Sequence, residues 1–450
     1  MSAHFDAIVA GAGLAGLAAA SALSKAGGRV LILERKPFVG GRAYSYAHPA
    51  LGEEIDCQHV LLGCCTNLVH LCQNAGVADR IRWYDELHFL EPNGQHTTLK
   101  PGILPAPLHT SFDFAKAPML SIADKAAIAR GLLNFMRGYP QDDHESFATW
   151  LKRTKQTPRA IKHLWEPVIV GALNDSFENC STKYAGQVFH ESFLKSPQGG
   201  RLGIPALPLS QFYSYVSEQC VRDGAELRTS QSVTALNQTE QGWTVATSEG
   251  PFTADNVILA LPFQQTDALL PADVQTGVQT GAYKNAPITT VHLWFDREIT
   301  TLDHAAFLDT GIQWIFNKSR IRNTPGHYAE LTISASFAQL HQTREHILAE
   351  ALRELALFFP KVREAKLLKS GILKEARATF SVTPGLDVHR PAQRTSQPGL
   401  FLAGDWTKTG WPSTMEGAVR SGYLAAEVVA NQRFLAPDLP ATGLMKLLAQ

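Results

Sequence analysis

The sequence predicts an α/β protein, and three observations support this. Residues 5–10 form a short apolar run of the kind found in buried parallel strands. A glycine turn, an Ala-rich segment to about Lys25 and a second apolar run at 29–34 follow, which is the order of a strand–helix–strand unit. Near the other end of the chain, an apolar strand at 400–403 and a helix at 413–431 repeat the strand–helix pattern.

Length and composition limit the possible functions. A chain of 450 residues exceeds the usual size of one domain, so two domains with sizeable cores are expected. Charged residues make up 18%, below the average of roughly 25%. Lys plus Arg equals Asp plus Glu at 41 each, so no net field favours nucleic acid, and no nucleic-acid partner is expected.

The cysteines and the N-terminus indicate a cytoplasmic protein. The apolar stretch 7–23 has no basic leader and contains three glycines, so we interpret it as neither a signal peptide nor a membrane span. The six cysteines are then expected to be reduced thiols. Four of them cluster between Cys57 and Cys72 without zinc spacing, so no metal is expected, and a helix at 66–73 is expected to bury some as small apolar residues.

The remaining pattern predicts a discontinuous domain. Pro-rich loops and helices fill about 76–207, and strands and helices alternate from about 210 onward. The expected helices are 122–136, 146–153, 210–222 and 343–359, and the expected strands are 226–236, 242–247, 256–261, 289–295 and 328–334. We assign 1–75, 210–265 and 385–435 to a dinucleotide-binding domain, 76–209 and 266–384 to an inserted α+β substrate domain, and 436–450 to a C-terminal tail.

The first turn carries a GxGxxG motif between a strand and a helix. Its residues are Gly11, Ala12, Gly13, Leu14, Ala15 and Gly16. The glycines allow a tight turn, close approach of backbone N–H groups to a pyrophosphate, and close helix–strand packing. Glu34 ends the next strand, where a carboxylate can hold both ribose hydroxyls and would repel a 2′-phosphate. Two further expected cofactor contacts are Arg35 and Val233.

Two more elements complete the expected cofactor site. Gly40 and Gly41 allow a loop to approach the cofactor, and Arg42 offers a planar fork to phosphate oxygens. Far along the chain, a buried strand ends at Gly404 and Asp405, whose carboxylate can accept hydrogen bonds from ribityl hydroxyls. A helix then begins near two further expected contacts, Thr414 and Met415, and its free N–H groups can stabilise negative charge on a reduced flavin ring.

These three elements resemble the flavin amine oxidase and phytoene desaturase superfamily. Further segments resemble a narrower family, the squalene-associated FAD-dependent desaturases, also called hydroxysqualene dehydroxylases. Those segments are 56–65, 82–85, 104–108, 124–130 and 410–422. The similarity extends to about Asn431, and Cys57 departs from the residue expected before Gln-His in that family.

The resemblance implies a Rossmann-like FAD-binding domain with an inserted lipid-tunnel domain. It also implies reductive removal of the allylic hydroxyl of hydroxysqualene to give squalene, with hydride from reduced FAD and loss of water, in squalene and hopanoid synthesis. His59 is the candidate acid for the departing hydroxyl, with Gln58 beside it and Asp56 to orient it. An equally open alternative is that His59 only hydrogen-bonds the flavin or the core.

Other functions share this fold. An amine oxidase is disfavoured because Thr414 stands where that branch carries a tyrosine of its aromatic cage. A polyene desaturase would run the hydride transfer in the opposite direction, and hydride transfer at the flavin is reversible in principle. A non-catalytic prenyl-lipid carrier, like the Rab GDP-dissociation inhibitors, would not need the set of Glu34, Arg42 and Asp405.

The expected partners follow from the implied reaction. No second GxGxxG follows a strand, so a dehydroxylase needs an external electron donor or reductase. No run of about twenty apolar residues exists. We therefore expect peripheral contact with the inner face of the cell membrane, through residues 103–136 or, failing that, through the tail at 444–448.

Overall fold

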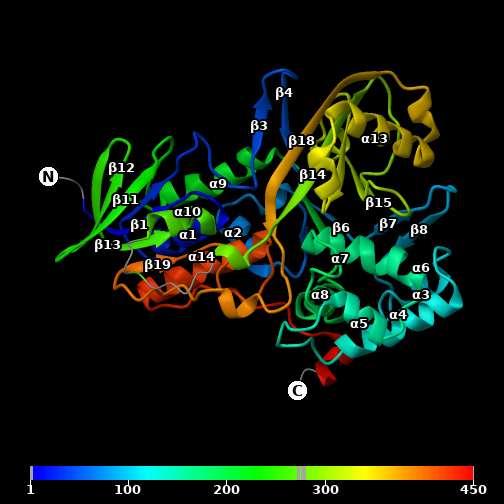
Figure 1. Ribbon diagram of the computed structural model, residues 1–450, viewed down its shortest axis with the longest axis horizontal. Coiled ribbons are helices and arrows are strands. Elements are labelled where there is room, and N and C mark those ends of the chain that lie inside the picture. Colours follow the sequence, from blue (N-terminus) through cyan, green and yellow to red (C-terminus); the bar gives the residue numbers. More distant parts are fainter. Residues whose placement is uncertain (1–3, 271–273, 275–279, 449–450) are drawn as a thin grey trace.

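The computed structural model describes residues 4–270, 274 and 280–448, and it contains two large sheets (Figure 1). The first sheet has the order β10-β2-β1-β13-β12-β11, with β19 beside β13. Its strands are β1 (His4–Ala10), β2 (Val30–Leu33), β10 (Glu226–Arg228), β11 (Val233–Thr239), β12 (Gly242–Thr247), β13 (Gly250–Leu259) and β19 (Leu400–Leu402). β1 pairs in parallel with β2 and β13, and β13 pairs in parallel with β19. The tail of the chain therefore lies in the same sheet as its first strand.

Helices bury one face of this sheet. Every residue of α1 (Leu14–Lys25) from Leu14 to Ser24 is buried, because α1 lies between the sheet and α14 (Met415–Ala430). A Cβ on Gly422 of α14 would lie 2.1 Å from the Ala15 carbonyl oxygen, so the two helices are in direct backbone contact. α9 (Leu209–Arg222) and α2 (Thr66–Asn74) pack in the same cluster.

The second sheet has the order β18-β14-β17-β16-β15-β7-β8. Its strands are β7 (Leu87–Leu90), β8 (His96–Leu99), β14 (Asn285–Phe295), β15 (His304–Phe307), β16 (Trp314–Asn317), β17 (His327–Ser334) and β18 (Leu367–Phe380). α13 (Arg344–Phe358) packs its buried side on this sheet. Two small sheets, β3-β4 and β5-β9-β6, comprise β3 (Ser45–His48), β4 (Glu53–Asp56), β5 (Leu61–Leu62), β6 (Ile81–Tyr84) and β9 (Leu202–Pro205).

A helical layer lies below the second sheet in Figure 1. It contains α3 (Ser111–Lys116), α4 (Ile122–Phe135), α5 (Phe147–Arg153), α6 (Pro158–Ala160), α7 (Glu166–Leu173), α8 (Thr182–Phe189) and the π-helical turns Ile161–Trp165 and His190–Leu194. The C-terminal turn Gly443–Leu447 packs against this layer, because the Leu444 amide donates to the Ala106 carbonyl at 2.9 Å. Shorter helices elsewhere are α10 (Phe263–Leu269), α11 (Lys318–Arg322) and α12 (Phe337–His341).

The predicted α/β class is confirmed, and most predicted elements lie within two or three residues of observed ones. The predicted strand 226–236 is wrong as a single element. Ser230 adopts a left-handed conformation with φ of 57°, so β10 joins one edge of the sheet and β11 the other. The residue limits assigned to the two domains stay a prediction. Among the helices that the structure describes, none has the length and apolar character to cross a bilayer.

Candidate active site

The predicted cofactor motifs meet around one cavity of about 580 Å³ at the carboxyl ends of β1 and β2. The predicted contacts that line it are Gly11, Gly13, Leu14, Ala15, Glu34, Arg35, Gly40, Gly41, Arg42, Val233, Gly404, Asp405, Thr414 and Met415. Ala12 and Gly16 lie just behind the lining. Two segments almost 400 residues apart in the sequence therefore line a single site.

Close backbone packing shapes this cavity. A Cβ on Gly16 would lie 1.8 Å from the Gly11 carbonyl oxygen, so only glycine lets α1 begin directly behind the turn. Gly41 has φ of 66°, and its Cβ would lie 2.9 Å from the Gly13 Cα. The two glycine loops touch, and the Gly40 amide donates to the Ala12 carbonyl at 2.8 Å. The uncapped N-terminus of α1 then faces the cavity with its free N–H groups, as anion binding requires.

Glu34 is buried at the end of β2 and held by backbone donors. Its Oε2 accepts the Ala12 amide at 2.8 Å, and its Oε1 accepts the Lys36 amide at 2.9 Å. Each oxygen keeps further lone-pair capacity for hydroxyl donors. The carboxylate is therefore fixed in position before any ligand binds.

Arg42 and Asp405 form an ion pair in the lining of the cavity. An Arg42 guanidinium nitrogen lies 2.5 Å from Asp405 Oδ1, and the Ser413 hydroxyl donates to Asp405 Oδ2 at 2.6 Å. Asp405 is buried, whereas the Arg42 side chain is 41% exposed. Thr414 caps α14 by accepting the Gly417 amide at 3.1 Å, which places the positive end of α14 at the same wall.

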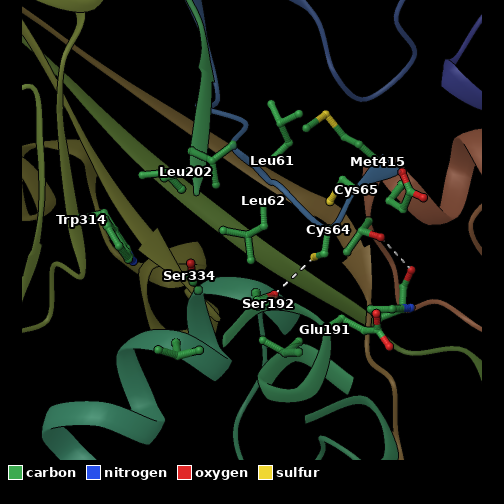
Figure 2. Close-up of a pocket in the computed structure, with 18 of the residues that line it drawn as sticks. Leu61, Leu62, Cys64, Cys65, Glu191, Ser192, Leu202, Trp314, Ser334 and Met415 are labelled. Atoms are coloured by element: carbon green, nitrogen blue, oxygen red, sulfur yellow. Dashed lines mark hydrogen bonds between the residues drawn. The ribbon is translucent and has the colours of Figure 1, made fainter. Parts of the chain in front are cut away.

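A second cavity, of about 220 Å³, adjoins the first and has mainly apolar walls. Figure 2 shows Leu61, Leu62, Leu202, Trp314 and Met415 among the side chains that line it. The residues common to the linings of both cavities are Gln58, Val60, Gly171, Ile288, Thr414 and Met415. We call this shared wall the junction. A ligand in the apolar cavity would meet a ring-bearing cofactor there.

His59 lines the cofactor cavity. Its Nδ1 lies 2.7 Å from the Cys57 carbonyl oxygen and donates to it, which leaves Nε2 as a hydrogen-bond acceptor in the neutral ring. Burial lowers the pKa of His59, and the Cys57 carbonyl only partly opposes this. The ring is thus oriented by a carbonyl and is neutral near pH 7. The predicted role of His59 stays a prediction.

Asp56 is buried and is not among the residues that line either cavity. Its carboxylate contacts the Lys318 ammonium at 2.8 Å and the Arg322 guanidinium at 2.6 Å. Burial raises the pKa of Asp56, but these two cations outweigh it and lower the value to about 2. Asp56 therefore belongs to a buried ion cluster, and the orienting contact expected from it is made by the Cys57 carbonyl.

Sequence reasoning missed several residues of the site. Lys318 and Glu330 belong to the second sheet and its flanking helix, far from the motifs in sequence. The available signal was the presence of charged residues within apolar runs, since buried charges need partners. Cys64 and Cys65, two of the four clustered cysteines, line the apolar cavity, where Cys64 contacts the Ser192 hydroxyl at 3.3 Å (Figure 2).

One group of three potential metal ligands occurs among the described residues, away from both cavities. It consists of Glu91, His163 and Asp309. The Arg159 guanidinium already lies 2.7 Å from Glu91, and His163 Nε2 lies 3.0 Å from Asp309. This arrangement works as an ion-pair cluster, because Arg159 supplies the positive charge that a metal would bring.

The fold and the cavity define a dinucleotide-binding oxidoreductase, and the comparisons identify its family. Residues 14–430 match the model of the family "Flavin containing amine oxidoreductase", and the chain belongs to that family. FAD is its cofactor. The touching glycine loops, the uncapped N-terminus of α1 and the anchored carboxylate of Glu34 fit the pyrophosphate and ribose of this group.

Relatives of known name are similar over nearly the whole chain. The 15-cis-phytoene desaturase of Synechococcus elongatus is 26% identical, covering 94% of this chain and 96% of its own. A probable zeta-carotene desaturase of the same organism is 27% identical, covering 95% and 99%. Among solved structures, an oxidoreductase from Methanosarcina mazei has a TM-score of 0.70 at 17% identity, covering 95% and 100%. Cyclohexylamine oxidase from Brevibacterium oxydans has a TM-score of 0.68 at 18% identity, covering 95% and 99%.

Removing either anchored carboxylate should weaken FAD binding without unfolding the chain. Glu34→Ala and Asp405→Ala each delete a charge-assisted hydrogen-bond partner, worth roughly 1.5–3 kcal/mol, so FAD affinity should fall about ten- to a hundredfold. The measurement is the flavin-to-protein ratio after gel filtration, with circular dichroism of the apoproteins. Glu226→Ala, an exposed carboxylate on the neighbouring β10, is the matched control. Full flavin occupancy in both variants would contradict the assignment.

Proposed function

We propose that this protein is an FAD-dependent oxidoreductase of long isoprenoid chains that introduces double bonds into a polyene. The observation that carries the proposal is the junction, where an apolar cavity meets the cofactor cavity. An apolar substrate gains roughly 0.8 kcal/mol for each CH₂ group buried in such walls. Relatives named phytoene and zeta-carotene desaturases support the substrate class and the direction.

The chain's own residues suit this chemistry. Bound FAD supplies a two-electron acceptor for hydride. Leu61, Leu202 and Trp314 hold the chain and exclude water. Neutral His59 offers Nε2 as a base for the proton lost from the carbon next to the hydride donor. A hydroxyl at Thr414, instead of a bulky aromatic ring, leaves the junction open to an extended chain.

A second candidate is the reductive dehydroxylation of hydroxysqualene, and one observation favours it. The half-buried Gln58 places an amide at the junction, and a substrate hydroxyl would be a partner for that polar group. The resemblance of segments 56–65 and 410–422 points the same way. In this reaction the electrons come from an external donor, and His59 must first gain a proton, which its lowered pKa opposes.

The direction of electron flow separates the two candidates. Anaerobic enzyme with oxidised FAD should lose its 450 nm-region absorbance when mixed with phytoene if it is a desaturase. Chemically reduced enzyme should regain that absorbance with hydroxysqualene if it is a dehydroxylase. Stopped-flow absorbance and product analysis measure both reactions, and squalene is the control ligand. No flavin response to either isoprenoid would overturn the proposal.

His59→Ala should keep FAD and lose turnover by about 100-fold, the usual scale for a general acid or base. Burial lowers the pKa of His59, so its base form predominates at neutral pH. The ordinary pKa of a histidine is about 6.5, so the rate of desaturation should stay constant as the pH falls to below that value. Dehydroxylation, which needs protonated His59, should accelerate only at pH values below about 6.5. Single-turnover rates across pH check this. A wild-type rate in the variant would assign His59 a positioning role.

Membrane contact would supply such a substrate, and the structure offers a surface for it. Ile103 is 95% exposed, and Leu108 and Phe112 of the following segment are also exposed. Four exposed apolar residues of α4 lie at helical spacing: Ile122, Ala126, Ala129 and Leu133. The C-terminal turn, docked on Ala106, adds Leu444 and Leu447. We propose that this surface rests on the inner face of the cell membrane.

Replacing Ile103, Leu108 and Phe112 together by Ser should abolish flotation with anionic liposomes. The change removes apolar area that would enter the headgroup layer while leaving the core and the FAD cavity untouched. The measurement is liposome flotation together with FAD content. The matched control replaces Phe337, Leu368 and Val388, which are 43–75% exposed on other elements. Flotation that survives in the first variant would place the contact elsewhere.

A further inference from the structure

Four charged side chains are buried together directly behind the junction. Lys318 Nζ contacts Asp56 Oδ1 at 2.8 Å and Glu330 Oε2 at 3.2 Å, and Arg322 contacts Asp56 Oδ2 at 2.6 Å. The Lys318, Asp56 and Glu330 side chains are at most 2% exposed, so none of these charges is solvated. A buried ion cluster of this kind contributes little net stability and stays folded only when each charge is paired.

Gln58 connects this cluster to the cavities. Its Oε1 accepts a hydrogen bond from Lys318 Nζ at 2.5 Å, and its Nε2 donates to the His59 carbonyl at 2.7 Å. Its backbone amide donates to Glu330 Oε1 at 2.6 Å. An ammonium can only donate, so the orientation of the Gln58 amide is fixed. Within the part of the chain that the structure describes, the second Nε2–H of Gln58 has no protein acceptor.

Gln58 is also the only member of this network that lines either cavity among the described residues. Asp56, Lys318 and Glu330 stand behind it and out of reach of a ligand. A purely structural ion pair would need one acid and one base. Here an ammonium is shared between two carboxylates and one amide oxygen, and the amide is the group that faces the cofactor site.

We propose that Lys318 is a positioning residue that holds the Gln58 amide as a hydrogen-bond donor to an acceptor atom of the bound flavin ring. Asp56 and Glu330 keep the ammonium charged, so Lys318 acts on the cofactor through Gln58, while the net charge of the cluster acts through space. This proposal depends on FAD binding alone and holds for either direction of hydride transfer.

Glu330 makes the network sensitive to pH. Burial raises its pKa to about 7, opposed by Lys318 and supported by the like charge of Asp56. The titratable and charged groups around it come from β4, the following loop, α11, β14 and β17: Asp56, Cys57, Lys318, Arg322, His292 and Tyr328. Burial lowers the pKa of His292 to about 3, so His292 is neutral. Above pH 7 two positive and two negative charges balance, and below it the cluster gains one net positive charge.

That charge should act on the flavin. A positive charge near the ring favours the reduced, more negative form, so the reduction potential should rise more steeply as pH falls through about 7. Glu330→Gln, which is isosteric and does not titrate, should lack this inflection and stay in the low-pH state throughout. Spectroelectrochemical titration of the holoenzyme from pH 5.5 to 8.5 measures it without any substrate.

A double-mutant cycle tests the positioning step. Gln58→Met and Lys318→Met should each shift the visible flavin spectrum and lower the reduction potential. Their combined effect should be smaller than the sum, because the part of the Lys318 effect that runs through Gln58 is already lost in the Gln58→Met protein. Arg322→Met is the matched control, because it removes a positive charge of the same cluster without touching Gln58, and its effect should be additive with Gln58→Met. Circular dichroism and FAD content establish folding of each variant.

The opposite results are equally clear. Additive effects of Lys318→Met and Gln58→Met, or an unchanged flavin spectrum and potential in Gln58→Met, would overturn the proposal. If Gln58→Met changed only the KM of an isoprenoid, the hydrogen-bond acceptor of the Gln58 amide would lie on the substrate and not on the flavin. That result would also overturn the proposal. If Lys318→Met does not fold, the absence of a pH inflection in wild-type holoenzyme, or its survival in Glu330→Gln, decides against the proposal.

Discussion

The contact between two glycine turns is the constraint on which the cofactor site depends. A Cβ on Gly41 would lie 2.9 Å from the Gly13 Cα, so any larger residue would push the two turns apart. The Gly40 amide donates a hydrogen bond to the Ala12 carbonyl between the same two turns. This contact leaves the N-terminus of α1 open to a pyrophosphate and fixes Glu34 beside it through the Ala12 amide. Arg42 follows Gly41 directly in the chain. One backbone contact therefore positions three groups that can bind the cofactor: the N-terminus of α1, Glu34 and Arg42.

The junction combines two opposed physical requirements. For the proposed reaction, the apolar cavity would hold a long hydrocarbon away from water, while other groups would move a proton and tune the flavin. The structure separates these tasks. Aliphatic and aromatic side chains form most of the apolar cavity. Among the described residues, Asp56, Lys318 and Glu330 do not line it, and Lys318 contacts the neutral amide of Gln58, which does. The buried charges are paired with one another, so none of them would be left unpaired against an apolar ligand.

Desaturation and dehydroxylation use the same architecture because hydride transfer at a flavin is reversible in principle. The protonation state of His59, next to the junction, therefore bears on the direction of hydride transfer. A neutral His59 with its Nδ1 on the Cys57 carbonyl suits proton acceptance, whereas a Gln58 amide that donated to a substrate hydroxyl, and not to the flavin, would favour dehydroxylation. The same two residues thus support different candidates, and only the electron flow separates them.

The sequence by itself determined the α/β class, the GxGxxG turn, Glu34, the Arg42 loop and the distant Asp405 segment. These features depend on local backbone geometry and on strand and helix periodicity, which are written into adjacent residues. Only the tertiary structure decided the partners of Asp56, the orientation of Gln58 and the place of Cys64 in a cavity wall. Lys318 and Glu330 are more than 250 residues from Asp56, and nothing local determines which buried charge pairs with which. The chain turn at Ser230, which sends β10 and β11 to opposite edges of one sheet, was hidden for the same reason, because strand pairing is a long-range contact.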